Sequence, residues 1–107
     1  MVTRVLESAG FLTYSAENGA AGLESFVRHA TEIALVITDV VMPVMSGVAM
    51  AEQIMELHPT AKIIVMSGYS DAALEIRARK SFPFIRKPFK AVDFLNAIGA
   101  VLRQGRD

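Results

Sequence analysis

The chain has 107 residues, of which 52% are hydrophobic and 21% charged, and its 11 basic residues balance 11 acidic ones. This size suits one domain with one core, and the neutral balance argues against nucleic acid or a membrane surface as the main partner. The absence of cysteine excludes disulfides and thiolate metal sites, and no apolar run approaches the ~20 residues that span a bilayer. We therefore expect one soluble domain in the cytoplasm.

In chain order, short apolar runs alternate with segments of helical period. Residues 2–9 are typical of the end of a helix, and the alternation over residues 12–16 predicts a strand. Residues 33–37 and 62–66 are nearly continuous apolar runs, typical of strands that are covered on both faces. Residues 82–85 predict a shorter strand, and its proline favours a position near a strand start or an edge.

Helical stripes lie between these runs. Residues 23–30 carry apolar side chains at i, i+3, i+4 and i+7, and residues 50–57 repeat the pattern up to the His58-Pro59 stop. Ser70 and Asp71 predict the start of a short helix to about Arg79, and residues 94–102 predict the last helix. This alternating order predicts an open, mainly parallel sheet with helices on both faces.

Three polar residues end successive predicted strands: Asp39, Ser67 and Lys87. In an open parallel sheet, ligands bind outside the carboxyl ends of the strands. A carboxylate there could form an acyl phosphate, while a hydroxyl and an ammonium could hold the phosphoryl oxygens. Each residue alone is more often a turn former or a solvated side chain. Together they predict one phosphoryl-binding crevice.

The residues around these positions resemble the response regulator receiver family of two-component systems. The motifs that carry the resemblance are Asp39-Val40-Val41-Met42-Pro43 with Gly47, then Met66-Ser67-Gly68-Tyr69, then Phe84-Ile85-Arg86-Lys87-Pro88-Phe89. The resemblance runs from about Leu6 to Leu102 and implies a doubly wound, flavodoxin-like (CheY-like) α/β fold. The second and third motifs are most similar to receivers attached to hybrid histidine kinases.

The resemblance implies a role for each matching position. Asp39 would accept a phosphoryl group from the phosphohistidine of a sensor histidine kinase or a phosphotransfer protein, and the Val41 carbonyl would help to bind Mg²⁺. Ser67 would be the switch hydroxyl, and Phe84 the switch aromatic. Lys87 would pair with the phosphoryl group and form a cis peptide with Pro88. The last two helices and the last strand would transmit the signal, so the chain would not be an enzyme.

The chain departs from the family pattern at its start. The family begins with a strand that ends in two acidic residues, and the residues before Phe11 have no room for such a strand and a complete helix. We therefore expect residues 1–107 to be an N-terminally truncated receiver that lacks the first strand. We expect Mg²⁺ binding to be weak or absent and phosphorylation to be slow. Exposed strand edges predict rearranged pairing, strand exchange or a homo-oligomer.

Of three other interpretations, one stays open and two are contradicted by the residues. A degenerate receiver that binds partners without phosphorylation is the main alternative; the missing acidic pair favours it, and the intact Asp39, Ser67 and Lys87 oppose it. An enzyme is a second alternative. Residues 18–22 contain glycine before a helix, but they lack the dinucleotide-binding and Walker patterns, so a turn is the better interpretation. A phosphotransfer role for His29 would need a helical bundle, which the short β-branched runs contradict.

Overall fold

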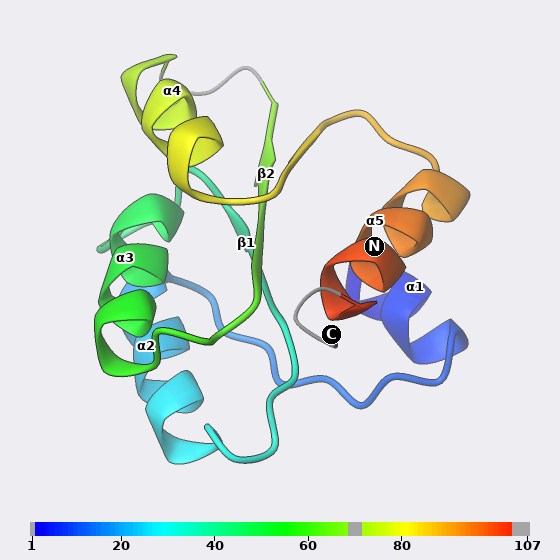
Figure 1. Cartoon of the computed structure of the whole chain (residues 1–107), viewed down its shortest axis with the longest axis horizontal. Coiled ribbons are helices and arrows are strands. Elements are labelled where there is room, and N and C mark those ends of the chain that lie inside the picture. Colours follow the sequence, from blue (N-terminus) through cyan, green and yellow to red (C-terminus); the bar gives the residue numbers. More distant parts are fainter. Residues whose placement is uncertain (1, 69–71, 104–107) are drawn as a thin grey trace.

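A parallel sheet between two layers of helices forms the molecule (Figure 1). The computed structural model describes residues 2–68 and 72–103. In these residues the strands are β1 (Val36–Asp39), β2 (Ile63–Ser67) and β3 (Phe84–Arg86), paired in the order β1-β2-β3. The helices on one side of the sheet are α2 (Gly19–Arg28), α3 (Gly47–Leu57) and α4 (Ala72–Ser81). Those on the other side are α1 (Val2–Ser8) and α5 (Ala91–Arg103).

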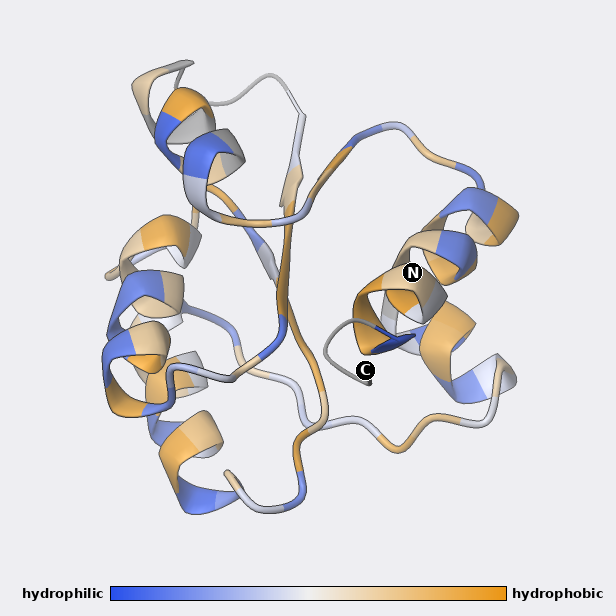
Figure 2. Ribbon diagram, viewed as in Figure 1, coloured by the Kyte–Doolittle hydropathy of each residue, from blue (hydrophilic) through white to orange (hydrophobic). Residues whose placement is uncertain are grey.

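The central strand β2 explains why residues 62–66 form a continuous apolar run. All five residues of β2 are buried, and its side chains alternate between two hydrophobic clusters. Ile63 and Val65 belong to the cluster with α2 and α3, whereas Ile64 and Met66 belong to the cluster with α5. In Figure 2, β2 is hydrophobic along most of its length, while the helices on either side mix hydrophobic and hydrophilic residues. The predicted doubly covered strand is therefore confirmed.

Side-chain caps start helices α2 and α3. The Asn18 carboxamide oxygen accepts a hydrogen bond from the Ala21 amide at 2.8 Å, and the Ser46 hydroxyl accepts one from the Ala49 amide at 3.0 Å. Each cap satisfies an amide that has no partner within the helix. Helix α3 ends at Leu57, as the His58-Pro59 stop predicts. No helix in the part of the chain that the structure describes is long and apolar enough to cross a membrane.

Two predictions of local structure differ from the observed fold. Residues 12–16 run without strand pairing, so the strand predicted there is wrong; Leu12 is 99% exposed. An extended segment needs a hydrogen-bonded neighbour to form a strand, and none lies beside this one among the described residues. The strand predicted from residue 33 begins only at Val36. The predicted cap at Ser70 and Asp71 lies outside the described residues.

Candidate functional site

Asp39 and Lys87 meet at the carboxyl ends of the outer strands. The Lys87 ammonium nitrogen lies 2.5 Å from one Asp39 carboxylate oxygen, and the two side chains are 42% and 43% exposed. Asp39 is the last residue of β1, and Lys87 directly follows β3. An ion pair this open to water leaves the carboxylate accessible to a ligand. The predicted approach of these two side chains is therefore observed.

Ser67 lies on the strand between them, with its hydroxyl turned to another partner. The Lys87 amide donates a hydrogen bond to the Ser67 carbonyl at 2.7 Å, and Asp39 pairs with Met66 in the register of the sheet. The backbone thus brings all three predicted residues to one edge. The Ser67 hydroxyl, however, is buried and donates to the Gly68 carbonyl at 3.3 Å. It would have to rotate before it could contact a group bound at Asp39.

The amino end of α3 packs directly against the backbone of Asp39. A methyl group in place of the Gly47 hydrogen would lie 1.6 Å from the Asp39 carbonyl oxygen and 2.6 Å from the Thr38 hydroxyl. The buried Thr38 hydroxyl donates to the Asp39 carbonyl at 3.0 Å. Gly47 and Thr38 therefore hold the Asp39 backbone in place. The sequence signals for this support are a glycine at the helix start and one polar residue within an apolar strand.

The loop between β1 and α3 carries the other predicted ligand. Val41, whose carbonyl is the expected metal ligand, is 50% exposed in this loop. Val44 in the same loop has φ of 69°, a left-handed conformation that is costly for a β-branched residue. Strained backbone of this kind is often found next to functional sites.

The predicted switch residue Phe84 and the predicted cis peptide lie beside this edge. The peptide bond between Lys87 and Pro88 is cis, which confirms that prediction. Phe84 is partly buried in β3 and packs against the cluster that contains Val65 and Phe82. Its ring therefore has both a core contact and access to solvent.

The acidic side chains of the described residues do not fit a well-formed Mg²⁺ site. No group of three or more His, Cys, Asp or Glu side chains in residues 2–68 and 72–103 could hold a metal ion. The remaining candidate ligands are the Asp39 carboxylate, which already contacts Lys87, and the Val41 carbonyl. Mg²⁺ requires a nearly octahedral set of oxygen ligands and is bound mainly through carboxylates and substrate phosphates. This pair of ligands supplies too little of that set.

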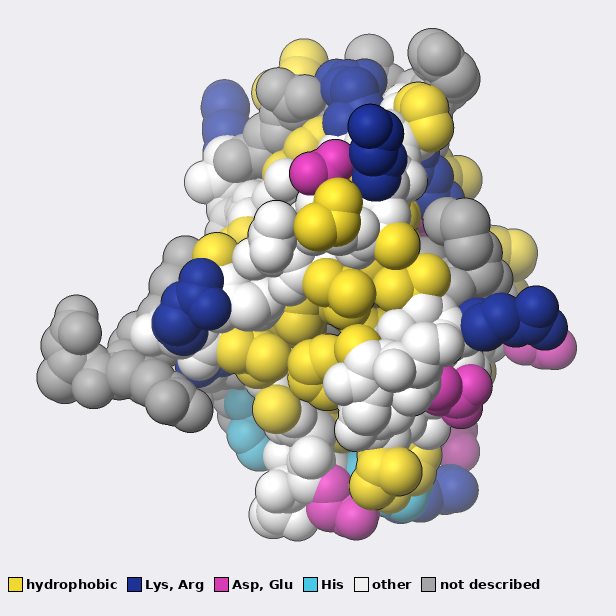
Figure 3. Space-filling model, turned by 90° about the vertical axis from the view of Figure 1, so that its right-hand side faces the viewer, with side chains coloured by type: hydrophobic (Ala, Val, Ile, Leu, Met, Phe, Trp, Pro, Cys, Tyr) yellow, Lys and Arg dark blue, Asp and Glu magenta, His cyan; other side chains and the backbone are white. Residues whose placement is uncertain are grey.

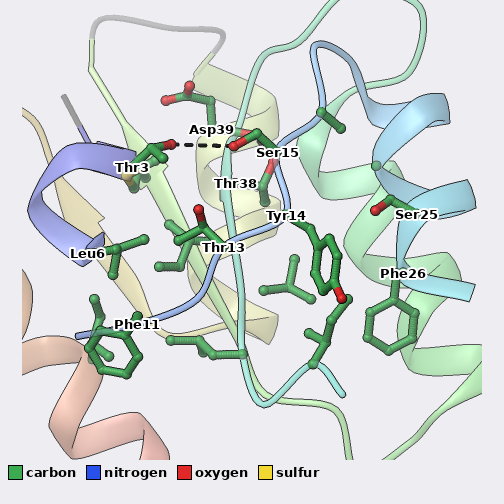
Figure 4. Close-up of a pocket in the computed structure, with 18 of the residues that line it drawn as sticks. Thr3, Leu6, Phe11, Thr13, Tyr14, Ser15, Ser25, Phe26, Thr38 and Asp39 are labelled. Atoms are coloured by element: carbon green, nitrogen blue, oxygen red, sulfur yellow. Dashed lines mark hydrogen bonds between the residues drawn. The ribbon is translucent and has the colours of Figure 1, made fainter. Parts of the chain in front are cut away.

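A cavity of about 1250 Å³ opens beside Asp39 and extends along β1. Figure 4 shows Leu6 and Phe11 on one side of β1 and Phe26 on the other. The Tyr14 hydroxyl in its wall donates to a Glu32 carboxylate oxygen at 3.3 Å; partial desolvation and that carboxylate raise the pKa of Tyr14. Sequence reasoning predicted exposed strand edges, and it identified neither the size nor the lining of this cavity.

Comparisons with known proteins identify the family to which the chain belongs. The family model described as the response regulator receiver domain matches residues 1–99. The sensor kinase CckA of Brucella abortus is 31% identical over 103 residues, which cover 94% of this chain and 11% of CckA. The receiver protein CpdR of the same organism is also 31% identical over 103 residues, covering 94% of this chain and 84% of CpdR.

A solved structure has the same fold. The CheX–CheY–BeF3–Mg²⁺ complex from Borrelia burgdorferi superposes with a TM-score of 0.82 at 27% identity, covering 94% of this chain and 77% of the solved chain. The flavodoxin-like fold that the sequence predicts is confirmed. This chain spans only a small part of CckA, so the activity of that whole protein does not transfer to it directly.

Proposed function

Because the chain belongs to the response regulator receiver family, we propose that Asp39 is its phosphoacceptor and takes a phosphoryl group from a phosphohistidine. One observation carries this assignment: the Asp39 carboxylate lies 2.5 Å from the Lys87 ammonium at the carboxyl edge of a parallel sheet. A nucleophile and a cation are thereby present together where ligands of such sheets bind.

The transfer needs a free carboxylate oxygen and a cation that can pair first with the carboxylate and then with the phosphoryl group. An oxygen of Asp39 attacks the phosphorus, a phosphorus–oxygen bond forms as the phosphorus–nitrogen bond of the donor breaks, and the imidazole leaves with a proton. The Lys87 ammonium, which now contacts the carboxylate, then pairs with a phosphoryl oxygen. Lys87 neutralises the Asp39 carboxylate before the transfer and the phosphoryl group on Asp39 after it.

The proposed switch depends on the hydroxyl of Ser67 and the ring of Phe84. In the observed state this hydroxyl donates to the Gly68 carbonyl. A phosphoryl oxygen is a stronger acceptor, so phosphorylation would draw the hydroxyl toward Asp39. Phe84 would change rotamer in response and alter the surface of β3, α4 and α5. Replacing Ser67 with alanine should leave phosphorylation intact while blocking this change in the Phe84 environment, which NMR spectra of the ring would report.

We propose weak binding of Mg²⁺, through Asp39 and the Val41 carbonyl. Mg²⁺ would supply charge neutralisation on the phosphoryl oxygens when bound, and the solved complex of Borrelia CheY contains Mg²⁺ together with BeF3. In this chain Lys87 would provide most of that neutralisation, because the described acidic groups do not complete a metal site. We expect a Mg²⁺ titration to saturate only above the millimolar range.

The partners are proposed from the chemistry of the donor. A sensor histidine kinase or a phosphotransfer protein would present the phosphohistidine, and the relationship to CckA is consistent with a partner of this kind. The chain would act as the acceptor and not as an enzyme with its own turnover. We also propose that residues 1–107 unfold as one cooperative domain. A homo-oligomer formed through exposed strand edges stays a prediction.

The decisive experiment is phosphorylation by acetyl phosphate, followed by intact mass measurement. We expect the native chain to gain the mass of one phosphoryl group, and Asp39→Asn to gain none. Asp93→Asn, which removes an exposed carboxylate in the first turn of α5, is the matched control and should gain it normally. A mass gain in Asp39→Asn would overturn the assignment, whereas no gain in the native chain would favour the degenerate receiver.

A further inference from the structure

Asparagine and glycine are adjacent at the start of α2. Asn18 is the N-cap of this helix: its carboxamide oxygen accepts a hydrogen bond from the Ala21 amide at 2.8 Å, and its backbone carbonyl accepts one from the Gly22 amide at 2.9 Å. Aspartate and serine cap helices about as well as asparagine. Of these three residue types, only asparagine carries a carboxamide, which can lose ammonia. The cap therefore combines a structural contact with a reactive group.

Packing against a neighbouring loop requires the glycine that follows. Gly19 is buried, and a methyl group in place of its hydrogen would lie 2.2 Å from the carbonyl oxygen of Met45. Met45 belongs to the loop between β1 and α3. A residue with a side chain therefore does not fit after Asn18. Because glycine has no side chain, its own amide nitrogen is also unhindered on the side of the Asn18 carboxamide.

We propose that Asn18 is a site of spontaneous deamidation. The Gly19 amide nitrogen gives its proton to solvent and attacks the carboxamide carbon of Asn18. A carbon–nitrogen bond forms, the bond to the carboxamide nitrogen breaks, and that nitrogen takes a proton and leaves as ammonia. Water then opens the cyclic imide at one of its two carbonyl groups, which yields aspartate or isoaspartate at position 18. The inference is independent of phosphorylation at Asp39.

The folded start of α2 controls when this reaction occurs. A planar imide ring needs rotation about the Cα–C bond of Asn18, whose ψ is 170° in the N-cap conformation. That rotation takes the Asn18 carbonyl away from the Gly22 amide, and ring closure takes the carboxamide away from the Ala21 amide. Both hydrogen bonds of the first turn must therefore break. Because a helix end opens at a lower free energy than the whole domain, the reaction rate follows the opening of this turn.

The two products should affect α2 differently. Aspartate keeps a side-chain oxygen for the Ala21 amide and adds a negative charge at the amino end of the helix, where such a charge is stabilising. Isoaspartate directs the backbone through the side chain and adds one methylene group between positions 18 and 19. Gly19 lies too close to the Met45 carbonyl to accommodate this extra length in place. We expect isoaspartate to hold the first turn of α2 open.

Ageing of the whole chain in mildly alkaline buffer tests the site. The tryptic peptide of residues 5–28 should gain about 1 Da, because ammonia is replaced by water, and should become a substrate of isoaspartyl methyltransferase. Asn96, the other asparagine of the chain, is the internal control, because it is exposed and is followed by Ala97 within α5. Helix α5 lies on the other side of the sheet from α2, the side that faces the viewer in Figure 3.

The expected result is a clear difference between the two asparagines. The peptide of residues 91–103 should be modified less than about one tenth as fast as the peptide of residues 5–28, since the alanine side chain and the helix hinder attack at Asn96. Asn18→Ser keeps a capping oxygen without a carboxamide and should abolish the mass gain in residues 5–28. Equal rates at Asn18 and Asn96 would overturn the proposal, as would a mass gain in Asn18→Ser.

Two glycine substitutions test the control by the first turn. Ala21→Gly weakens α2 at an exposed position in its first turn and should speed the reaction at Asn18 about fivefold. Ala100→Gly causes a similar loss of helix propensity at an exposed position of α5 and should change the rate by less than about twofold. Equal acceleration in both variants would overturn this control, because opening of the whole domain would then limit the reaction.

Thermal unfolding and amide hydrogen exchange test the effect of the products. Asn18→Asp reproduces one product and should have a Tm at least as high as that of the native chain. Aged chains that contain isoaspartate should have a lower Tm and faster exchange at the Ala21 and Gly22 amides. Repair by isoaspartyl methyltransferase, which converts isoaspartate to aspartate, should restore both quantities. An unchanged Tm and unchanged exchange after repair would overturn the proposed effect on α2.

Discussion

The Lys87 ammonium contacts the Asp39 carboxylate at 2.5 Å, although Asp39 ends one outer strand of the sheet and Lys87 follows the other. The contact is possible because β1, β2 and β3 are parallel and end at the same edge. Both side chains are more than one-third exposed, so solvent screens the pair and its contribution to folding is small. We infer that the arrangement serves ligand binding more than stability.

Replacing Lys87 with methionine should separate these two effects. We expect the free energy of unfolding to change by less than about 1 kcal/mol, because the ion pair is half exposed. Phosphorylation by acetyl phosphate should slow by roughly 100-fold, because the variant lacks the cation that stabilises the negative charge of the phosphoryl oxygens in the transition state. Urea unfolding and the rate of mass gain measure the two quantities. Lys90→Met, an exposed lysine three residues away, should change neither.

Gly47 should tolerate no side chain. In Gly47→Ala the new methyl group would lie 1.6 Å from the Asp39 carbonyl oxygen, so the start of α3 would have to move away from β1. We expect a loss of about 2–3 kcal/mol in urea unfolding, similar to other cases of overpacking.

The matched control for this variant is Gly99→Ala in α5. The nearest atom to its new methyl group is a guanidinium nitrogen of Arg103 at 3.1 Å, at the end of a flexible side chain. Alanine favours the helix, so the same measurement should show a change between zero and a gain of about 1 kcal/mol. An equal loss in both variants would contradict the close approach at Asp39.

Val44 should be improved by a residue that accepts its backbone conformation. Its φ of 69° is unfavourable for valine, and asparagine tolerates the left-handed region better. Because Val44 is 84% exposed, Val44→Asn removes little packing and should stabilise the chain by about 1 kcal/mol. Thermal unfolding measures the gain. Val41→Asn in the same loop, where no positive φ is relieved, should give no such gain.

The contact between Glu52 of α3 and Arg77 of α4 should make the free energy of unfolding depend on pH in the acidic range. The Arg77 guanidinium donates from Nε to a Glu52 carboxylate oxygen at 2.7 Å, and this hydrogen bond holds the pKa of Glu52 below its ordinary value of 4.5. The contribution is therefore present above pH 4.5 and is lost as the pH falls through the folded-state pKa.

Glu52→Gln tests this pH dependence. Both side chains of the pair are more than one-third exposed, so we expect the variant to lose less than about 1 kcal/mol at pH 7. The difference from the native chain should shrink toward zero as the pH falls from 4.5 through the lowered folded-state pKa of Glu52. Urea unfolding across that range measures it, with Glu56→Gln on the same helix as the control. A difference that stays constant with pH would show that the ion pair is not its source.

The sequence by itself determined the order of the helices, the doubly covered strand β2 and the three residues at the edge of the sheet. These features are local: a continuous apolar run, a helical stripe and a proline stop depend on residues near one another in the chain. The strand ends could be inferred for the same reason, and with them the positions of Asp39, Ser67 and Lys87.

Only the tertiary structure decided which side chains touch. It brought Lys87 to Asp39, turned the Ser67 hydroxyl to the Gly68 carbonyl, and placed Gly47 against the Asp39 backbone. It also left residues 12–16 unpaired, because an alternating run becomes a strand only when a neighbour supplies hydrogen bonds. Pairing is a property of two segments, so no pattern within one of them could determine it.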